Sequence, residues 1–272
     1  MRSRLPAEGC SEHEPAEVEL TGGVAHRGLV VRVGDTVRRP GSSPAVHALL
    51  EHLAAVGFEG APRFLGVDDR GRDVLSYIEG TPAVPPYPAW ALTDEALVSV
   101  AELLRGYHSA AAAFDPGPHA WPTTLPGRYT GELVTHNDPN LDNVIFRDGR
   151  AVALIDFDLA GPGSRVWDVA AAARMWAPLR PDEHIPDERR GRALARFQLF
   201  LDAYGVPPDE RADVVAAVRV NQQWFCRLVE AEVWAGHEGF TEYWTSGASE
   251  RAVATARWLS QNESDLRAAA GC

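Results

Sequence analysis

The sequence predicts an α+β fold of two lobes, with a small β-rich N-terminal lobe and a larger, mainly helical C-terminal lobe. Short β-prone runs separated by glycine turns fill the chain up to residue 80, whereas helical periodicity dominates from residue 93 onward. The chain has 272 residues, of which 45% are hydrophobic, and this is enough for two lobes with a cleft between them. The predicted segments are a flexible N-terminal arm (1–16), the N-terminal lobe (17–80), a hinge or linker (81–92) and the C-terminal lobe (93–272).

The N-terminal lobe begins with three predicted strands, which cover residues 18–20, 29–33 and 36–39. Glycine-containing turns separate them, the first at Gly22-Gly23 and the second at Gly34-Asp35. A helix is then expected over 44–56, because its leucines and valine share one face and Gly57 ends the pattern. Two further apolar segments, 63–67 and 74–78, lead into the proline-rich hinge.

The C-terminal lobe is expected to begin with a core helix from Thr93, its N-cap, to about residue 113. His108 lies near the apolar stripe of this helix, where a packed, hydrogen-bonded histidine is more common than a catalytic one. Asp168 precedes an alanine-rich helix and is expected to cap it. Beyond residue 187 the pattern is almost entirely helical, with helices expected over 214–234 and 250–266.

The stretch from Val134 to Asp158 carries the polar residues that predict the chemistry. Asp138 follows His136 by two positions, and Asn143 follows Asp138 by five. Asp156 then closes a second apolar run. The order is therefore loop, strand, turn, strand and carboxylate.

An Asp148-Gly149 dipeptide between the β-prone runs 144–146 and 152–155 is a strong hairpin signal. Folding this hairpin sets Asn143 beside Asp156. An amide oxygen and a carboxylate are the hard oxygen ligands that Mg²⁺ prefers, provided that substrate phosphates and water complete the octahedron. Asp158 would share the strand face with Asp156 if the strand continues, and it is then either a second metal ligand or an exposed acid.

The segment HNDPNLDN followed by IDFD resembles the H-x-D-x-x-x-x-N catalytic loop and metal-binding Asp of aminoglycoside phosphotransferases and choline kinases, which are distant relatives of protein kinases. The resemblance covers most of the chain from about Val18 onward and implies a protein-kinase-like fold. It implies that Asp138 is the catalytic base and that Asn143 and Asp156 hold Mg²⁺. It also implies that His136 and Asp168 brace the catalytic loop.

The same resemblance implies a nucleotide site in the N-terminal lobe and hinge. The Gly22-Gly23 turn would lie over the phosphates, although it is equally typical of an ordinary hairpin turn. The backbone of Ser76, Tyr77 and Ile78 would pair with the base of ATP or GTP. Side-chain identity at these hinge positions carries little information.

The family's third strand carries a phosphate-binding lysine, and this chain has none, because all 26 of its basic residues are arginine. The corresponding strand contains Arg38 and Arg39, which point to opposite faces. If the family spacing carries over, Arg39 faces the phosphates, and Arg38 is the alternative. Either arginine could instead be a solvated charge at the edge of the sheet. Protein kinases pair the strand lysine with a Glu on the following helix, where Glu51 is the available acid. Glu51 could equally face solvent.

The composition excludes several other classes. Without lysine there is no Walker A loop, Schiff base or Ser-Lys nucleophile. The net charge of -12 argues against binding nucleic acid, and no apolar run reaches the roughly 20 residues that span a membrane. No apolar signal-peptide core begins the sequence, and three cysteines without C-x-x-C spacing are expected to be reduced thiols. We therefore expect a cytoplasmic protein with no nucleic-acid or membrane partner.

The predicted function is transfer of the γ-phosphoryl group of a Mg²⁺-nucleotide, ATP or GTP, to a hydroxyl of an aminoglycoside-, choline- or sugar-like small molecule. The acidic net charge is compatible with a cationic acceptor. Tryptophans and glutamates of the C-terminal helices could enclose such a cation, although core aromatics and solvated acids are the commoner case. These residues are Trp224, Trp234, Trp244, Glu230, Glu232, Glu238 and Glu242.

Two other functions are compatible with the sequence. The missing lysine is also typical of a pseudokinase, which would bind nucleotide and act as a regulator without transferring phosphate. A metal-dependent hydrolase could use the same carboxylates, but it would need neither an acceptor nor a hinge. We rank the hydrolase last.

Overall fold

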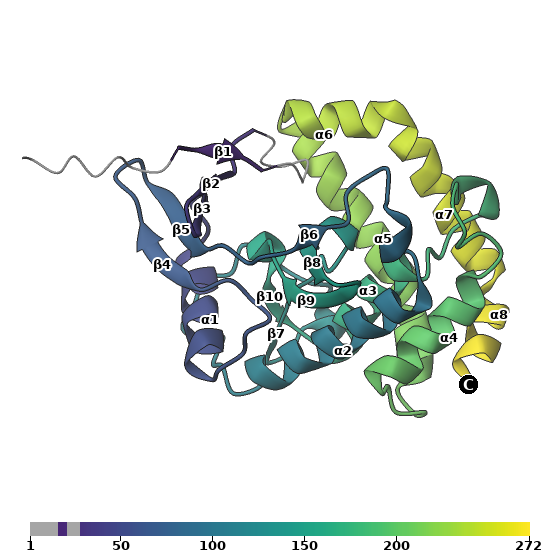
Figure 1. Ribbon diagram of the computed structural model, residues 1–272. Helices are drawn as coiled ribbons and strands as arrows, with labels where there is room; N and C mark the ends of the chain where they lie inside the picture. The colour runs from purple at the N-terminus through teal and green to yellow at the C-terminus, as the bar shows by residue number, and fades with distance from the viewer. Residues whose placement is uncertain (1–15, 21–27) are drawn as a thin grey trace, which may run out of the picture.

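The structure is a computed structural model that describes residues 16–20 and 28–272 (Figure 1). A small strand-rich lobe lies on the left of Figure 1, and a larger helical lobe fills the centre and the right. The α+β class and the two-part architecture expected from the sequence are confirmed.

A five-stranded antiparallel sheet forms the N-terminal lobe. In spatial order its strands are β1 (Val18–Glu19), β2 (Val31–Val33), β3 (Thr36–Pro40), β5 (Arg72–Ser76) and β4 (Phe64–Val67). β3 pairs with β5 in the register that sets Arg39 opposite Asp73. The strand expected over 74–78 lies two residues earlier in the chain, so Tyr77 and Ile78 follow β5 instead of belonging to it.

Helix α1 (Pro44–Ala55) connects β3 to β4 and begins at a side-chain cap. The Val46 amide donates to Ser43 Oγ at 3.4 Å, and Pro44 suits the first helical turn, where its missing N–H costs nothing. The buried face contains the predicted apolar stripe, including Leu49, Leu50 and Leu53. The helix therefore packs under the sheet and against the next helix of the chain.

The C-terminal lobe is built on α2 (Asp94–Ala111) and two small sheets. One sheet has the order β6 (Thr81–Pro82), β8 (Val144–Arg147) and β9 (Arg150–Leu154), and in the other β10 (Gly161–Gly163) pairs with β7 (Leu133–Thr135). Thr93 caps α2 as predicted, accepting the Ala96 amide at 3.1 Å. Strand β6 comes from the segment expected to be hinge, so this segment is hydrogen-bonded to the C-terminal lobe.

The remaining helices complete the larger lobe. They are α3 (Arg165–Trp176), α4 (Ala193–Tyr204), α5 (Arg211–Trp234), α6 (Glu238–Tyr243), α7 (Ser249–Gln261) and α8 (Glu263–Ala270). The single helix expected over 250–266 is thus divided, with α7 ending before Asn262. Within the described ranges, no helix has both the length and the apolar character needed to cross a membrane.

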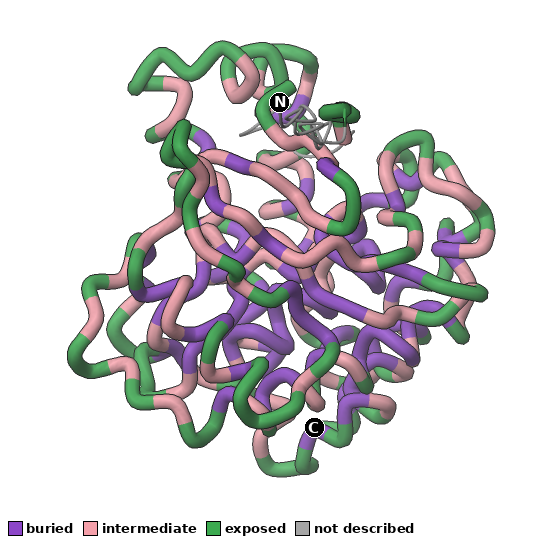
Figure 2. Tube along the Cα trace, turned by 60° about the vertical axis from the view of Figure 1, so that its left-hand side comes forward, coloured by how far each residue is buried: buried purple, intermediate pink, exposed green. Residues whose placement is uncertain are grey.

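The core of the C-terminal lobe lies where α2, α3, α4 and α5 meet, and Figure 2 shows the buried chain gathered along the middle of the molecule. Tyr107, Trp167, Trp176 and Phe197 are among its largest fully buried side chains. A run of alanines on α3 lets the neighbouring helices approach closely, so this helix is held rigidly against the rest of the lobe.

Two local expectations are wrong. Ser164 caps α3, because its Oγ accepts the Trp167 amide at 3.3 Å, and Asp168 lies inside the first turns with its side chain directed elsewhere. Strand β9 ends at Leu154, and Asp156 adopts a left-handed conformation with φ of 62°. Asp156 and Asp158 therefore do not share a strand face, and Asp158 lies in a one-turn helix.

Candidate active site

A cavity of about 230 Å³ lies where the N-terminal sheet faces the β8–β9 hairpin. Six of the residues predicted for nucleotide or metal line it, namely Arg39, Ser76, Tyr77, Ile78, Asn143 and Asp156. Its other walls are Leu20, Val30, Val37, Pro62, Leu75, Gly80, Pro82, Asp142, Ile145 and Ile155. Largely apolar walls with a few polar groups, among them Arg39, Asn143 and Asp156, suit a flat base with a charged tail. The expected phosphate turn at Gly22 and Gly23 lies outside the described residues.

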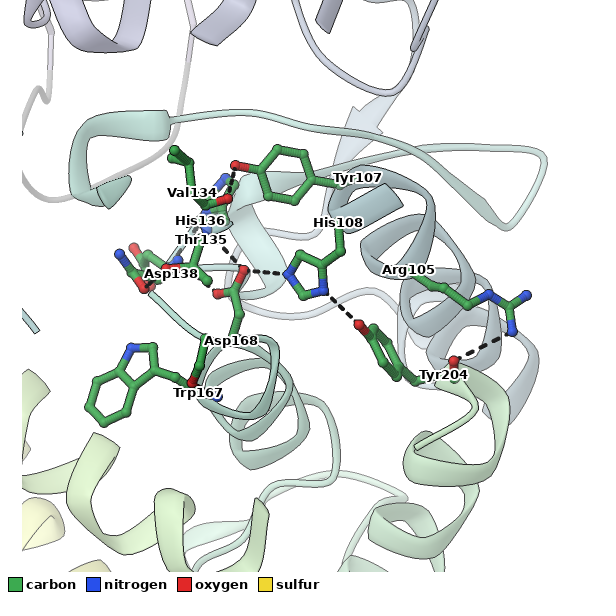
Figure 3. Close-up of polar contacts among 12 residues, drawn as sticks. Arg105, Tyr107, His108, Val134, Thr135, His136, Asp138, Trp167, Asp168 and Tyr204 are labelled. Carbon is green, nitrogen blue, oxygen red and sulfur yellow. Dashed lines mark hydrogen bonds and ion pairs between the residues drawn. The ribbon is translucent and has the colours of Figure 1, made fainter. Parts of the chain in front are cut away.

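The loop that contains Asp138 is held from below by the carboxylate of Asp168 (Figure 3). Asp168 Oδ2 accepts the His136 amide at 2.8 Å, and Oδ1 accepts the Asn137 amide at 2.8 Å. Oδ2 also contacts His108 Nε2 at 2.9 Å, and His108 Nδ1 contacts the Tyr204 hydroxyl at 2.7 Å. His108 is therefore a hydrogen-bonded core histidine.

Asp168 is completely buried, and burial alone would raise its pKa. The hydrogen bond from His108 and the amide of His136 outweigh burial, so the pKa of Asp168 lies below its usual value. A buried carboxylate that stays ionised keeps all of its hydrogen bonds. It thus holds the catalytic loop in one conformation, including Asn137, whose φ is 69°.

The His136 side chain joins the catalytic loop to the end of β9. Its Nε2 lies 3.0 Å from the Ile155 carbonyl, and its Nδ1 lies 3.4 Å from the Asp138 amide. This pattern fits a neutral ring that donates from Nε2 and accepts at Nδ1. Burial lowers the pKa of His136, in agreement with the neutral form.

The carboxylate of Asp138 is positioned by two side-chain amides. Asn140 Nδ2 donates to Oδ1 at 2.9 Å, and Asn143 Nδ2 donates to Oδ2 at 3.0 Å. Burial raises the pKa of Asp138 to about 7, and the negative charge of Asp156 acts in the same direction. Asp138 does not line the cavity, but its hydrogen bond to Asn143 ties it directly to the cavity floor.

The hairpin brings Asn143 and Asp156 together, as the sequence predicts. The Ile155 amide donates to the Asn143 carbonyl at 2.9 Å, and the adjacent residue, Asp156, then turns toward the cavity. Because Asn143 Nδ2 is engaged with Asp138, the side-chain Oδ1 of Asn143 is left to accept. An amide oxygen and a carboxylate facing one cavity fit Mg²⁺, with the remaining ligands supplied by phosphate and water.

Arg39, which was expected to face the phosphates, lies on β3 and lines the cavity. The side chain is buried, with its Nη1 3.2 Å from Asp156 Oδ1 and its Nη2 paired with Asp158. Burial alone would lower the pKa of Arg39, but these two carboxylates raise it. Arg38 points to the other face, 3.8 Å from Asp68, and Glu51 is exposed to solvent.

The residues considered for a cationic acceptor are spread over core and surface. Trp224 is buried, packs 5.5 Å from the Trp167 ring and donates to the Thr124 carbonyl, whereas Trp234 is 89% exposed. The other tryptophan, Trp244, is half-buried. Among the glutamates, Glu230, Glu238 and Glu242 are exposed, and the half-buried Glu232 lies 3.4 Å from His237.

Two charged residues near the site were not predicted from the sequence. Asp142 lines the cavity one position before Asn143, and its place inside the motif could have drawn attention to it. Arg174 acts on the Asp138 carboxylate, lowering its pKa against the effect of burial. It lies on α3, far from the motif in the chain, so no local signal marks it.

Comparison with known proteins agrees with this geometry. The phosphotransferase enzyme family matches residues 119–200, which include the catalytic loop, the hairpin and Asp168. The trifolitoxin immunity protein of Rhizobium leguminosarum bv. trifolii is 36% identical over 209 residues, covering 73% of this chain and 78% of that protein.

Two solved structures share the fold over nearly the whole chain. A choline/ethanolamine kinase family protein from Mesorhizobium loti superposes with a TM-score of 0.65 at 18% identity, covering 96% of this chain and 94% of the other. The GDP complex of aminoglycoside 2'-phosphotransferase-IIIa gives a TM-score of 0.57 at 14% identity, covering 94% of each. The chain belongs to the phosphotransferase enzyme family, with the protein-kinase-like fold of the aminoglycoside phosphotransferases and choline kinases.

Proposed function

We propose that this protein transfers the γ-phosphoryl group of ATP or GTP to a hydroxyl of a small molecule. The single observation that carries the proposal is the chain of contacts from Asp138 through Asn143 to the cavity that Asn143 and Asp156 line. In this proposal Asp138 would be the proton acceptor, next to Asn143 and Asp156, which would be two oxygen ligands in a cavity with largely apolar walls.

Asp138 would accept the proton of the acceptor hydroxyl as its oxygen attacks the γ-phosphorus. The bond between this phosphorus and the bridging oxygen breaks, and its electron pair leaves with the nucleoside diphosphate. Asn143 Oδ1 and the Asp156 carboxylate would hold Mg²⁺, which neutralises charge on the phosphate oxygens when bound. Catalysis of this type depends on positioning, and the amides of Asn140 and Asn143 fix the Asp138 carboxylate before any ligand arrives.

Arg39 would bind the nucleotide phosphates in place of the missing lysine. Its guanidinium stays charged and offers a fork of donors that suits phosphate oxygens. Its contacts with Asp156 and Asp158 keep the guanidinium beside Asp156, which lines the cavity. The backbone at Ser76, Tyr77 and Ile78 would receive the base, and these residues line the same cavity.

The relative named for trifolitoxin immunity supports a protective role for this activity. Aminoglycoside phosphotransferases, whose fold this chain shares, are named for aminoglycosides as acceptors. Phosphorylation of a toxic compound would combine the two, because a phosphate adds charge and bulk that a target site rejects.

Substitution Asp138→Asn tests the proposal, with nucleoside diphosphate release and mass analysis of the acceptor as readouts. Transfer should fall at least 100-fold, the lower end of what a general base contributes, while Mg²⁺-nucleotide binding persists. Asp148→Asn is the matched control, because this acid is exposed in the same hairpin and its φ of 50° suits asparagine. Transfer that survives Asp138→Asn would remove this residue from the mechanism.

A nucleotide-binding regulator is the second candidate, favoured by one observation. Arg39 pairs with Asp156, so the proposed metal ligand already has a positive partner. Thermal-shift titration with ATP and GTP, with and without Mg²⁺, followed by transfer assays, separates the two functions. Nucleotide binding without transfer to any acceptor would favour the regulator.

A further inference from the structure

Arginines inside this protein are commonly paired with carboxylates. Arg39, Arg189 and Arg196 each lie within 3.2 Å of an aspartate oxygen. Arg174 and Arg180 differ, because neither makes an ion pair within residues 16–20 and 28–272. A half-buried guanidinium without a counter-charge is costly, so these two require an explanation.

Neutral groups hold Arg174 in place. Its Nε donates to Asn221 Oδ1 at 3.1 Å, and its Nη1 donates to Gln222 Oε1 at 2.6 Å, both from α5. The guanidinium also lies 5.6 Å from the Phe225 ring centroid. These contacts orient the side chain without neutralising it. Nη2 has no hydrogen-bond partner in the described part of the chain and is not sealed from solvent.

Arg180 follows the end of α3 and makes neither a hydrogen bond nor an ion pair with the described residues. The nearby Asp187 is already engaged, because its two oxygens accept from Arg189 at 2.8 Å. Burial lowers the pKa of Arg180, and burial together with the charge of Arg180 lowers the pKa of Arg174 to about 10. The charge of Asp138 raises the pKa of Arg174 and the charge of Asp187 raises the pKa of Arg180, but burial outweighs both.

Arg174 lies in the last turn of α3, and Arg180 follows the end of that helix. Trp176, at the end of α3, donates its indole N–H to the Pro139 carbonyl at 2.9 Å, which fastens this end of the helix to the catalytic loop. Arg174 is close enough for its charge to act on the Asp138 carboxylate. Neither Arg174 nor Arg180 is among the residues that line the cavity with Asn143. Their position suits the acceptor and not the nucleotide.

We propose that the acceptor is an anion, a small molecule that carries a carboxylate or phosphate group as well as the reacting hydroxyl. Arg174 and Arg180 would hold the anionic group while the hydroxyl faces Asp138. A guanidinium fork matches the paired oxygens of such groups. The two positive charges would also offset repulsion between the anion and Asp138. This inference rests on the proposed function, and it replaces the cationic acceptor expected from net charge.

The test uses four probes with one three-carbon skeleton: glycerate, glycerol phosphate, glycerol and aminopropanediol. Their affinities for the full chain are measured by calorimetry and by thermal shift. We expect glycerate or glycerol phosphate to bind at least about 10-fold more tightly than glycerol or aminopropanediol. A hydrogen bond between charged groups contributes about this change in affinity. Comparing the carboxylate with the phosphate identifies which anion the site prefers.

Arg180→Gln removes no hydrogen bond or ion pair to a described residue, so it should fold and should weaken binding of the preferred anion about 10-fold or more. Arg174→Gln should do the same. Arg150→Gln carries the same charge change at a side chain that is 70% exposed, and it should leave anion affinity unchanged. Anionic probes that bind no better than glycerol would overturn the proposal, as would equal losses in the Arg150 and Arg180 variants.

Mg²⁺-nucleotide binding and phosphate transfer are measured in parallel on the same samples. Loss of anion binding in Arg180→Gln with nucleotide binding intact is the expected result. If anions bind through these arginines but no nucleotide binds, the proposed phosphotransferase function fails and the anion site stands. If nucleotide is used with aminopropanediol as the best acceptor, the function stands and the anion site fails.

Discussion

Two charged regions near Asp138, one at Asp168 and one at Arg174, are built in opposite ways. In the first region, Asp168 is fully buried and its oxygens accept from two backbone amides and His108. In the second region, Arg174 is held by two neutral amides and the Phe225 ring, and Arg180 has no hydrogen-bonding or ionic partner among the described residues. The contrast is between a buried charge whose partners are complete, as expected of a group that serves the fold, and a charge that is oriented but not neutralised, as our proposal expects of a group that serves a ligand.

The largest expected effect comes from removing the charge of Asp168. Asp168→Asn should lower the free energy of unfolding by about 3–5 kcal/mol, because an amide nitrogen would then face donors that a carboxylate satisfied. Urea unfolding at neutral pH measures the change. Asp213→Asn, an exposed acid in the first turn of α5, is the control and should change stability by less than about 0.5 kcal/mol. Similar values for the two variants would contradict the role assigned to Asp168.

Measuring stability at several pH values gives a second test of the role of the Asp168 charge. The folded-state pKa of Asp168 lies below its usual value of 3.8, so its charge contributes stability that is present above this pH and is lost as pH falls through the folded pKa. The stability difference between wild type and Asp168→Asn should therefore be constant from neutral pH to about pH 5 and shrink below 3.8. Unfolding curves over this range test it, and a gap that widens toward low pH would have the wrong sign.

The smallest effect on stability is expected at Arg180, which we propose binds the acceptor. Arg180→Gln should change the free energy of unfolding by no more than about 0.5 kcal/mol, or raise it, since an uncompensated charge is removed. Arg196→Gln is the matched contrast, because it breaks a contact of 2.6 Å with Asp94 and should cost more than about 1 kcal/mol. Thermal and urea unfolding measure both variants. A large loss in Arg180→Gln would mean that this arginine serves the fold.

The residues of the candidate site differ in how far they could be predicted from sequence. Asn143 and Asp156 meet because one hairpin joins them, and a hairpin is specified by its turn and its two strands. The choice between Arg38 and Arg39 depends on the pairing of β3 with β5, which alternation along a strand alone leaves open. Asp168 was expected to cap a helix, but Ser164 makes that contact and Asp168 reaches the loop instead.

The sequence by itself determined the features that depend on neighbours in the chain. These are the two-lobed α+β class, the Thr93 cap, the hairpin and the motif from His136 to Asp156, because turns, caps and periodicity act over a few residues. Only the tertiary structure decided which charged side chains have an oppositely charged partner within the protein and which do not. The partners of Arg174 are 47 and 48 positions away on α5, and their approach depends on how two helices pack, for which no local pattern exists.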